Sequence, residues 1–230
     1  MPIALITGAS RGLGRAAAHA LARRGWSLIV DARRADDLAA AMRGLADVVA
    51  LPGDVTDPGH RAGLAAAVGS AGGLDVLVNN ASRLGPSPQP LLRDYPLDEL
   101  GRVYESNVVA PLALIQLLTA PLTAAAGTIV NVSSDAAVEA YPGWGGYGSA
   151  KAALDQLTAV LAAEEPSLHC YAFDPGDMRT DMHQQAFPGE DISDRPEPET
   201  VIPALLRLID ERPPSGRYRA SDLAAPAVTP

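Results

Sequence analysis

Thr7-Gly8-Ala9-Ser10-Arg11-Gly12-Leu13-Gly14 is the stretch that decides the fold of this chain. It follows a short apolar run, Ile3–Ile6, and it opens an Ala- and Leu-rich stretch with helical spacing, residues 13–24. Glycines let the backbone turn sharply and approach a ligand without a Cβ in the way, and the N-terminus of a helix attracts a pyrophosphate. A strand, a glycine loop and a helix in this order predict a dinucleotide site, although a plain tight turn also uses such glycines.

The rest of the chain repeats this alternation of short apolar runs and longer helical stretches. The expected strands are residues 3–6, 27–31, 48–51, 76–78, 128–132 and 168–173, with a last edge strand at 216–219. The expected helices are residues 13–24, 35–44, 60–69, 97–122 (kinked by Pro111), 147–163 and 200–210. Continuous apolar strands joined by helices are typical of buried parallel strands with right-handed crossovers. The predicted fold is α/β, a Rossmann-like doubly wound parallel sheet flanked by helices on both faces.

Size and composition fit one layered domain. The chain has 230 residues, so residues 1–230 are expected to form a single domain. Hydrophobic residues make up 47% and aromatic residues only 4%, so the core must be built from Ala, Leu, Val and Ile, which suits helices stacked on a parallel sheet. The Pro-rich, acidic segment around 178–199 is expected to be a mobile substrate flap, and the end after Asp222 to be loosely ordered.

Charge and cysteine content exclude several classes of partner. The formal net charge of −9 argues against nucleic-acid binding, because the chain repels phosphate backbones. The single cysteine, Cys170, allows no internal disulfide and fits a reducing compartment. Residues 1–7 carry no basic leader pattern, and no apolar run is expected to approach the roughly 20 residues that span a bilayer. A cytoplasmic protein without a membrane partner or a metal site is expected.

Tyr147-Gly-Ser-Ala-Lys151 is the sharpest chemical feature of the sequence. Residues four apart on a helix share a face, and a nearby cation lowers the pKa of a phenol by favouring the phenolate. A tyrosine with a reference pKa of about 10 can then exchange a proton near neutrality. The pair alone arises often by chance. It is accompanied by Ser134 at the end of the fifth expected strand and by Asn107 on the long helix.

Together with the glycine loop, these residues make the chain similar to the short-chain dehydrogenase/reductase family, of the single-domain type with Thr-Gly-x-x-x-Gly-x-Gly and Tyr-x-x-x-Lys motifs. The resemblance covers roughly residues 2–218 and implies that Asn107, Ser134, Tyr147 and Lys151 are catalytic. In the roles that it implies, Tyr147 is the acid/base at the carbonyl oxygen and Ser134 orients that oxygen. Lys151 lowers the tyrosine pKa and binds the nicotinamide ribose, and Asn107 holds a water in a proton relay.

The same resemblance implies which residues hold the cofactor. They are Gly8, Ser10, Arg11, Gly12, Leu13, Gly14, Arg33, Asp54, Val55, Asn80, Ala81, Tyr147, Lys151, Pro175, Gly176, Met178 and Thr180. Asp54 is expected either to contact the adenine or to serve in a helix N-cap with Thr56 and Asp57. Ser82 stands where the family pattern Asn-Asn-Ala-Gly has glycine, which is expected to loosen the backbone packing slightly.

The residues after the second strand bear on the choice of cofactor. An acid at the end of that strand usually binds the ribose of NAD. Counted from Gly25, the position that the family resemblance gives to this acid falls on Ala32, which Arg33 and Arg34 follow, while Arg11 lies in the glycine loop. Two converging guanidinium groups suit a 2′-phosphate, so NADP(H) is expected over NAD(H). The alternative is that the arginines are solvated and that Asp31 binds the ribose.

The predicted function is that of an oxidoreductase that transfers a hydride between NADP(H) and a ketone, an aldehyde or a secondary alcohol. The alternative is a catalytically silent NADP(H)-binding sensor or scaffold. A nucleotide-sugar epimerase or dehydratase is disfavoured, because the stretch after Asp174 is too short for a substrate domain. Residues 83–95, 135–146 and 181–199 are expected to border the small-molecule substrate, with Trp144 and Tyr141 either lining its pocket or packing. His183 is expected to be a solvated histidine of the flap, with a functional role as the alternative. A homodimer or homotetramer is expected.

Overall fold

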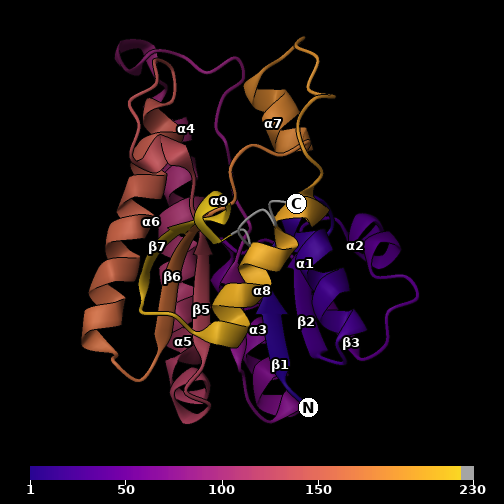
Figure 1. The fold of residues 1–230 in the computed structure, drawn as a ribbon. Helices are drawn as coiled ribbons and strands as arrows, with labels where there is room; N and C mark the ends of the chain where they lie inside the picture. Colours follow the sequence, from indigo (N-terminus) through magenta and orange to yellow (C-terminus); the bar gives the residue numbers. More distant parts are fainter. Residues whose placement is uncertain (224–230) are drawn as a thin grey trace, which may run out of the picture.

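Seven parallel strands form the centre of the structure, a computed structural model that describes residues 1–223 (Figure 1). In chain order they are β1 (Ile3–Ile6), β2 (Ser27–Ala32), β3 (Val48–Pro52), β4 (Val76–Asn79), β5 (Thr128–Val132), β6 (His169–Asp174) and β7 (Gly216–Arg219). They lie in the order β3-β2-β1-β4-β5-β6-β7. The order reverses between β1 and β4, and in such sheets ligands bind outside the carboxyl ends of the strands at that point. The predicted doubly wound sheet is confirmed.

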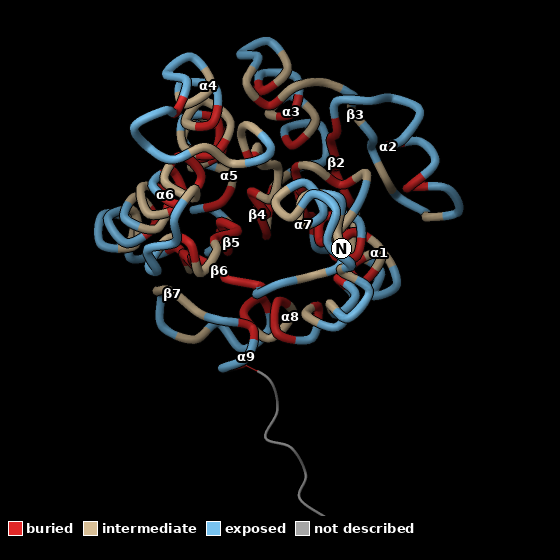
Figure 2. The backbone as a smooth tube through the Cα atoms, turned by 90° about the horizontal axis from the view of Figure 1, so that it is seen from above, coloured by how far each residue is buried: buried red, intermediate tan, exposed pale blue. Residues whose placement is uncertain are grey.

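Helices cover both faces of this sheet (Figure 1). They are α1 (Gly12–Arg23), α2 (Ala35–Ala41), α3 (Pro58–Ala71), α4 (Leu97–Tyr104), α5 (Ala110–Ala124), α6 (Gly145–Glu164), α7 (Asp181–Ala186), α8 (Ile202–Glu211) and α9 (Ala220–Leu223). Successive strand residues point to opposite faces, so Ile6 joins a core with α1 and α8, whereas Leu5 joins a second core with α3 and α5. Figure 2 shows the buried strands between helices whose outer surfaces are exposed.

The long helix expected over residues 97–122 is broken into two by a π-helical turn, Glu105–Val109. Pro111 lies just after that turn, in the first turn of α5. Because proline has no N–H, it cannot donate to the carbonyl of Asn107, and the wider turn accommodates the loss. The interruption of the helix thus lies just before the proline, as a π-helical turn in which Asn107 is 1% exposed. The kink itself stays a prediction.

The joined run Leu97–Ala124 is 28 residues long and contains an 18-residue window with a mean hydropathy of 1.5, so by length and composition it could cross a membrane. The expectation that no apolar run approaches this length is wrong. The test carries little weight, because a buried core helix passes it as well, and Leu114, Leu118 and Leu122 of this run pack in the core beneath the sheet.

The C-terminal part contains more structure than the sequence suggests. The segment 178–199 includes α7, which Thr180 begins by accepting the backbone N–H of His183 on its side-chain oxygen. Helix α8, expected over residues 200–210, starts at Ile202 after a 3-10 turn, Pro198–Val201, and β7 forms the sheet edge as predicted. Residues 224–230, most of the end expected to be loose, lie outside the described residues, and the mobility of the flap stays a prediction.

Candidate active site

The glycine loop lies between β1 and α1 and leaves the N-terminus of α1 open to a ligand. Gly8 and Gly12 have φ angles of +68° and +54°, in the left-handed region that favours glycine. The side-chain amide of Asn80 donates to the carbonyl oxygens of Thr7, at 2.8 Å, and of Gly8, at 3.1 Å. The end of β4 thus fixes the loop from behind.

Gly14→Ala is expected to disrupt this loop, because an added Cβ would lie 2.5 Å from both Asn80 Nδ2 and the Gly8 carbonyl oxygen. Overpacking of this kind costs roughly 1–3 kcal/mol. We expect a lower Tm by thermal unfolding and a weaker Kd for NADPH by fluorescence titration. Gly63→Ala is the matched control, since its Cβ would meet nothing within 4 Å. Equal Tm and Kd in the two variants would contradict this account of the loop.

A cleft of about 810 Å³ opens at the carboxyl ends of the strands and collects most of the predicted site residues. Its wall includes every residue expected to hold the cofactor except Gly14, which supports the loop from beneath. Three of the four expected catalytic residues, Ser134, Tyr147 and Lys151, lie on the same wall. The glycine loop and the volume of the cleft both fit a dinucleotide.

Tyr147 and Lys151 lie on α6 and are 8% and 2% exposed. The Lys151 Nζ donates to the carbonyl oxygen of Val132 at 2.7 Å and lies 5.5 Å from the centre of the Tyr147 ring. Burial lowers the pKa of Lys151 to about 8. Burial also raises the pKa of Tyr147 well above its usual value, which a hydrogen bond with Ser82 only partly offsets. Desolvation of the phenol therefore outweighs any lowering of this pKa by Lys151, and the role that the family resemblance implies for Lys151 stays a prediction.

Ser134 follows β5, and its hydroxyl belongs to a turn. The Oγ donates to Asp135 Oδ1 at 2.9 Å and accepts the backbone N–H of Ala136 at 3.2 Å. These contacts begin the 3-10 turn Asp135–Ala137. The residue still lines the cleft, so the turn and the orienting role are compatible.

Asn107 lies behind the cleft wall. Its Oδ1 accepts the backbone N–H of Arg83 at 2.8 Å and the hydroxyl of Ser82 at 3.2 Å, and its Nδ2 donates to the Arg83 carbonyl at 2.9 Å. The side chain thus fixes the segment after β4. Nothing in these contacts tests the water relay that the family resemblance implies for Asn107.

Ser82 connects Asn107 with the phenol of Tyr147, a role that the sequence did not suggest. We expect Ser82→Ala to reduce turnover about 2–10-fold, since a net hydrogen bond is worth roughly 0.5–1.5 kcal/mol, and to raise the apparent pKa that Tyr147 contributes. The measurement is kcat against pH, with Ser70→Ala on the exposed face of α3 as the control. An unchanged pH profile in Ser82→Ala would show that the contact has no catalytic effect.

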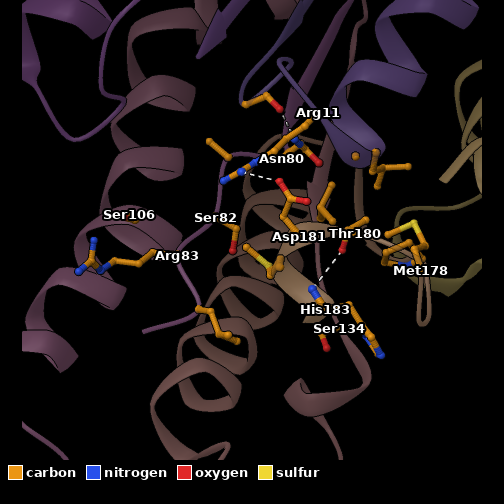
Figure 3. Close-up of a pocket in the computed structure, with 18 of the residues that line it drawn as sticks. Arg11, Asn80, Ser82, Arg83, Ser106, Ser134, Met178, Thr180, Asp181 and His183 are labelled. Atoms are coloured by element: carbon orange, nitrogen blue, oxygen red, sulfur yellow. Dashed lines mark hydrogen bonds and ion pairs between the residues drawn. The ribbon is translucent and has the colours of Figure 1, made fainter. Parts of the chain in front are cut away.

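The arginines expected to converge on a phosphate do not do so in this structure. Arg11 extends across the cleft to Asp181 of α7, with 2.7 Å between Nη1 and Oδ2 (Figure 3). Arg33 is exposed on the cleft wall. The carboxylate of Asp54 accepts the backbone N–H and the hydroxyl of Thr56 at 2.9 and 2.8 Å. Burial raises its pKa, but these bonds outweigh burial and leave it below the usual value.

Both interpretations of Asp54 find support, since it lines the cleft and also stabilises the turn before α3. The N-cap of α3 itself is Asp57, which accepts the backbone N–H of Gly59 at 2.9 Å.

The other end of the cleft is apolar and aromatic. The ring of Trp144 lies 5.9 Å from those of Tyr147 and Phe187, and His183 lies 4.8 Å from Phe187. All three segments expected near the substrate contribute residues here, including Leu84, Trp144 and Met182.

The surroundings of the Trp144, Tyr141 and His183 side chains show which of the expectations for these residues hold. Trp144 lines the cleft, whereas Tyr141 points to Asp135, donates to its Oδ2 at 3.1 Å and is exposed. The interpretation of His183 as solvated is wrong, because its side chain is 10% exposed and packs on Phe187. Its polar neighbour is Asp177, whose Oδ1 lies 3.6 Å from Nδ1.

Arg217 supports the site from the edge strand β7, and sequence reasoning missed it. Its Nη2 donates to the backbone carbonyl of Ser134 at 2.9 Å and to Asp174 Oδ2 at 2.8 Å, and its Nε donates to Asp155 Oδ2 at 3.0 Å. The guanidinium therefore joins the backbone of Ser134, helix α6 and the end of β6. In the sequence, this role of Arg217 was indicated only by the presence of a charged residue in the expected edge strand.

Comparisons with known proteins agree with this geometry. Residues 2–191 match the family model described as short chain dehydrogenase. Sepiapterin reductase of Mus musculus is 35% identical over 201 residues, which cover 80% of this chain and 77% of that protein. A structure from Shigella flexneri complexed with NADP shares 28% identity with a TM-score of 0.87, covering 96% and 97% of the two chains. An alcohol dehydrogenase from Thermococcus sibiricus complexed with 5-hydroxy-NADP shares 26% identity with a TM-score of 0.84, covering 95% of each chain.

Proposed function

The chain belongs to the short-chain dehydrogenase family of oxidoreductases, and from this premise we propose that it transfers a hydride between NADP(H) and a ketone, an aldehyde or a secondary alcohol. The observation that carries the proposal is the placement of Ser134, Tyr147 and Lys151 on the wall of the cleft that the glycine loop opens. A silent sensor or scaffold needs the glycine loop but has no use for this group.

The roles of the residues follow from their surroundings. The bound nicotinamide supplies or accepts the hydride. Tyr147, whose pKa burial keeps high, holds the proton that a carbonyl oxygen needs on reduction. Ser134 offers a hydroxyl on the same wall to orient that oxygen, and Lys151 places a buried cation behind the phenol. Trp144 and Leu84 exclude water from this end.

NADP(H) is the cofactor that the cleft favours. Arg33 is exposed on its wall, and Arg11 is held there only by a surface ion pair, with side-chain exposures of 60% for Arg11 and 65% for Asp181. Such pairs are worth roughly 0–1 kcal/mol, so a 2′-phosphate can replace Asp181 at Arg11. The NADP complexes of two similar structures support the same choice.

A planar, largely apolar carbonyl compound is the substrate class that we propose. The ring of Trp144 stands beside Tyr147 on the cleft wall, with Phe187 packed against Trp144, and an aromatic wall favours flat ligands through stacked and edge-on contacts. Similarity to sepiapterin reductase makes sepiapterin a reasonable member of the first panel, with aromatic aldehydes and aromatic vicinal diketones.

The direction of catalysis is expected to depend on pH. Lys151, with a pKa of about 8, loses its charge as the pH rises through that value, while Tyr147 keeps its proton. Without that cation the phenol gives up its proton less readily, so carbonyl reduction should fall above about pH 8. Alcohol oxidation, which needs the phenolate to accept a proton from the alcohol, should rise with pH. Initial rates in both directions from pH 6 to 10 test this. Parallel pH profiles in the two directions would contradict it.

The proposal is tested by titrating the protein with NADPH and with NADH, followed by NADPH oxidation with the carbonyl panel. We expect tighter NADPH binding, a loss of that preference in Arg33→Ala and Arg11→Ala, and turnover of at least one aromatic carbonyl. Tighter NADH binding would reverse the cofactor assignment. Binding without any turnover would favour the silent sensor or scaffold.

A further inference from the structure

Asp31, the acid near the end of β2, has both carboxylate oxygens engaged inside the protein. Its Oδ1 accepts the backbone N–H of Gly8 at 2.7 Å, and its Oδ2 lies 3.1 Å from Nε2 of His60. The residue is 1% exposed although it touches the cofactor cleft. The carboxylate therefore anchors the glycine loop.

His60 reaches Asp31 from the first turn of α3 and has little freedom to leave it. Its side chain is 9% exposed, and its ring lies against the backbone of Gly53, where an added Cβ would be 2.2 Å from Nδ1. Glycine at position 53 thus makes room for the imidazole. The pair joins two elements that are 29 residues apart in the chain.

The charges around His60 favour its protonated form. The hydrogen bond with Asp31 raises its pKa most, burial opposes this, and the charges of Asp31, Asp57 and Asp54 add to the increase. These acids face the ring from β2, from the N-cap of α3 and from the turn after β3. A protonated His60 cancels the charge of Asp31 beneath a cleft wall that also carries the exposed Arg33.

An ionised acid at the end of the second strand normally binds the ribose hydroxyls of NAD and repels the 2′-phosphate of NADP. We propose that His60 is a specificity-determining residue, which holds Asp31 in place and neutralises its charge so that the cleft accepts a 2′-phosphate. This inference rests on the proposed NADP(H)-dependent function. His60 acts through Asp31 and needs no contact of its own with the cofactor.

The test compares Kd for NADPH and NADH, by fluorescence titration at pH 7.5, in the wild-type protein, His60→Ala, His60→Ala/Asp31→Asn and the control His19→Ala. The two nucleotides differ only in the 2′-phosphate, so the ratio of their Kd values cancels any general damage to the glycine loop. His19 lies on α1, where it contacts the Ala41 carbonyl outside the cleft. We expect His60→Ala to reduce the preference for NADPH by about tenfold, the effect of one screened charge, and the double variant to regain it.

Other results overturn the inference. Equal weakening of both nucleotides in His60→Ala would show a structural role only, and a shifted ratio that persists in the double variant would show that Asp31 is not involved. If His60→Ala does not fold, the pH dependence of the preference for NADPH in the wild-type and Asp31→Asn proteins tests the inference instead. The wild-type preference, measured above the range where the phosphate itself titrates, should decline as the pH rises and His60 loses its proton, and Asp31→Asn should lack this decline. A wild-type protein that binds neither nucleotide would instead refute the proposed function.

Discussion

Tyr147→Phe is expected to reduce turnover about 10²–10⁴-fold, the range that a positioned acid/base contributes, while the Kd for NADPH changes little. The ring of Tyr147 packs against Trp144, and phenylalanine keeps that packing. The substitution removes only the hydroxyl, which holds the proton at the end of the cleft. The measurement is kcat with the best carbonyl substrate, together with the NADPH titration.

Tyr218→Phe is the matched control for this variant. It removes an exposed hydroxyl that donates to the Pro214 carbonyl at 2.7 Å, away from the cleft. Its turnover should equal that of the wild-type protein. Turnover retained in Tyr147→Phe would exclude the phenol as the acid/base, and a joint loss of turnover and NADPH binding would mean that the substitution damages the cleft itself.

Arg217→Met is expected to destabilise the fold by about 3 kcal/mol, the lower end of what removing one partner from a buried ion pair costs, because Arg217 is itself 23% exposed. Asp174 and Asp155, whose side chains are 4% and 15% exposed, then lose the cation that they share. The Ser134 carbonyl loses its donor as well, so turnover should fall even where the protein is folded. Urea denaturation gives the change in the free energy of unfolding.

Arg24→Met is the control for the buried pair, because the Arg24–Asp210 pair is exposed and should contribute no more than about 1 kcal/mol. Adding Asp174→Asn to Arg217→Met should recover part of the lost stability, since it removes one of the two carboxylates that the first substitution leaves without Arg217. A similar small loss in Arg217→Met and Arg24→Met would show that the network behind Ser134 does not stabilise the fold.

The sheet was predictable because parallel strands are buried on both faces and therefore appear as continuous apolar runs. Ile3–Ile6 and Thr128–Val132 are such runs, and the structure places both where the sequence indicated. The glycine loop was equally legible, since Gly8 and Gly12 adopt backbone angles that few other residues tolerate. The strands and the glycine loop depend on residues that are close together in the sequence, so a short stretch of sequence is enough to predict them.

The features that the sequence did not reveal depend on contacts between distant residues. Asp31 and His60 are 29 residues apart, and Arg217 lies 83 residues from the Ser134 carbonyl. Only the sheet order brings these partners together. The rise in the pKa of Tyr147 was not predictable for a related reason, because spacing on a helix places a cation nearby but says nothing about desolvation.

The central claim is that hydride passes between the bound nicotinamide and a carbonyl carbon at the Tyr147 end of the cleft. The most direct test supplies NADPH deuterated at C4, in each of its two stereochemical forms, with an aromatic vicinal diketone, and analyses the product by mass spectrometry. We expect one form to deliver a single deuterium to the carbinol carbon, and Tyr147→Phe to abolish the labelled product. NADPH that binds tightly but yields no labelled alcohol from either form, with any member of the carbonyl panel, would contradict the account.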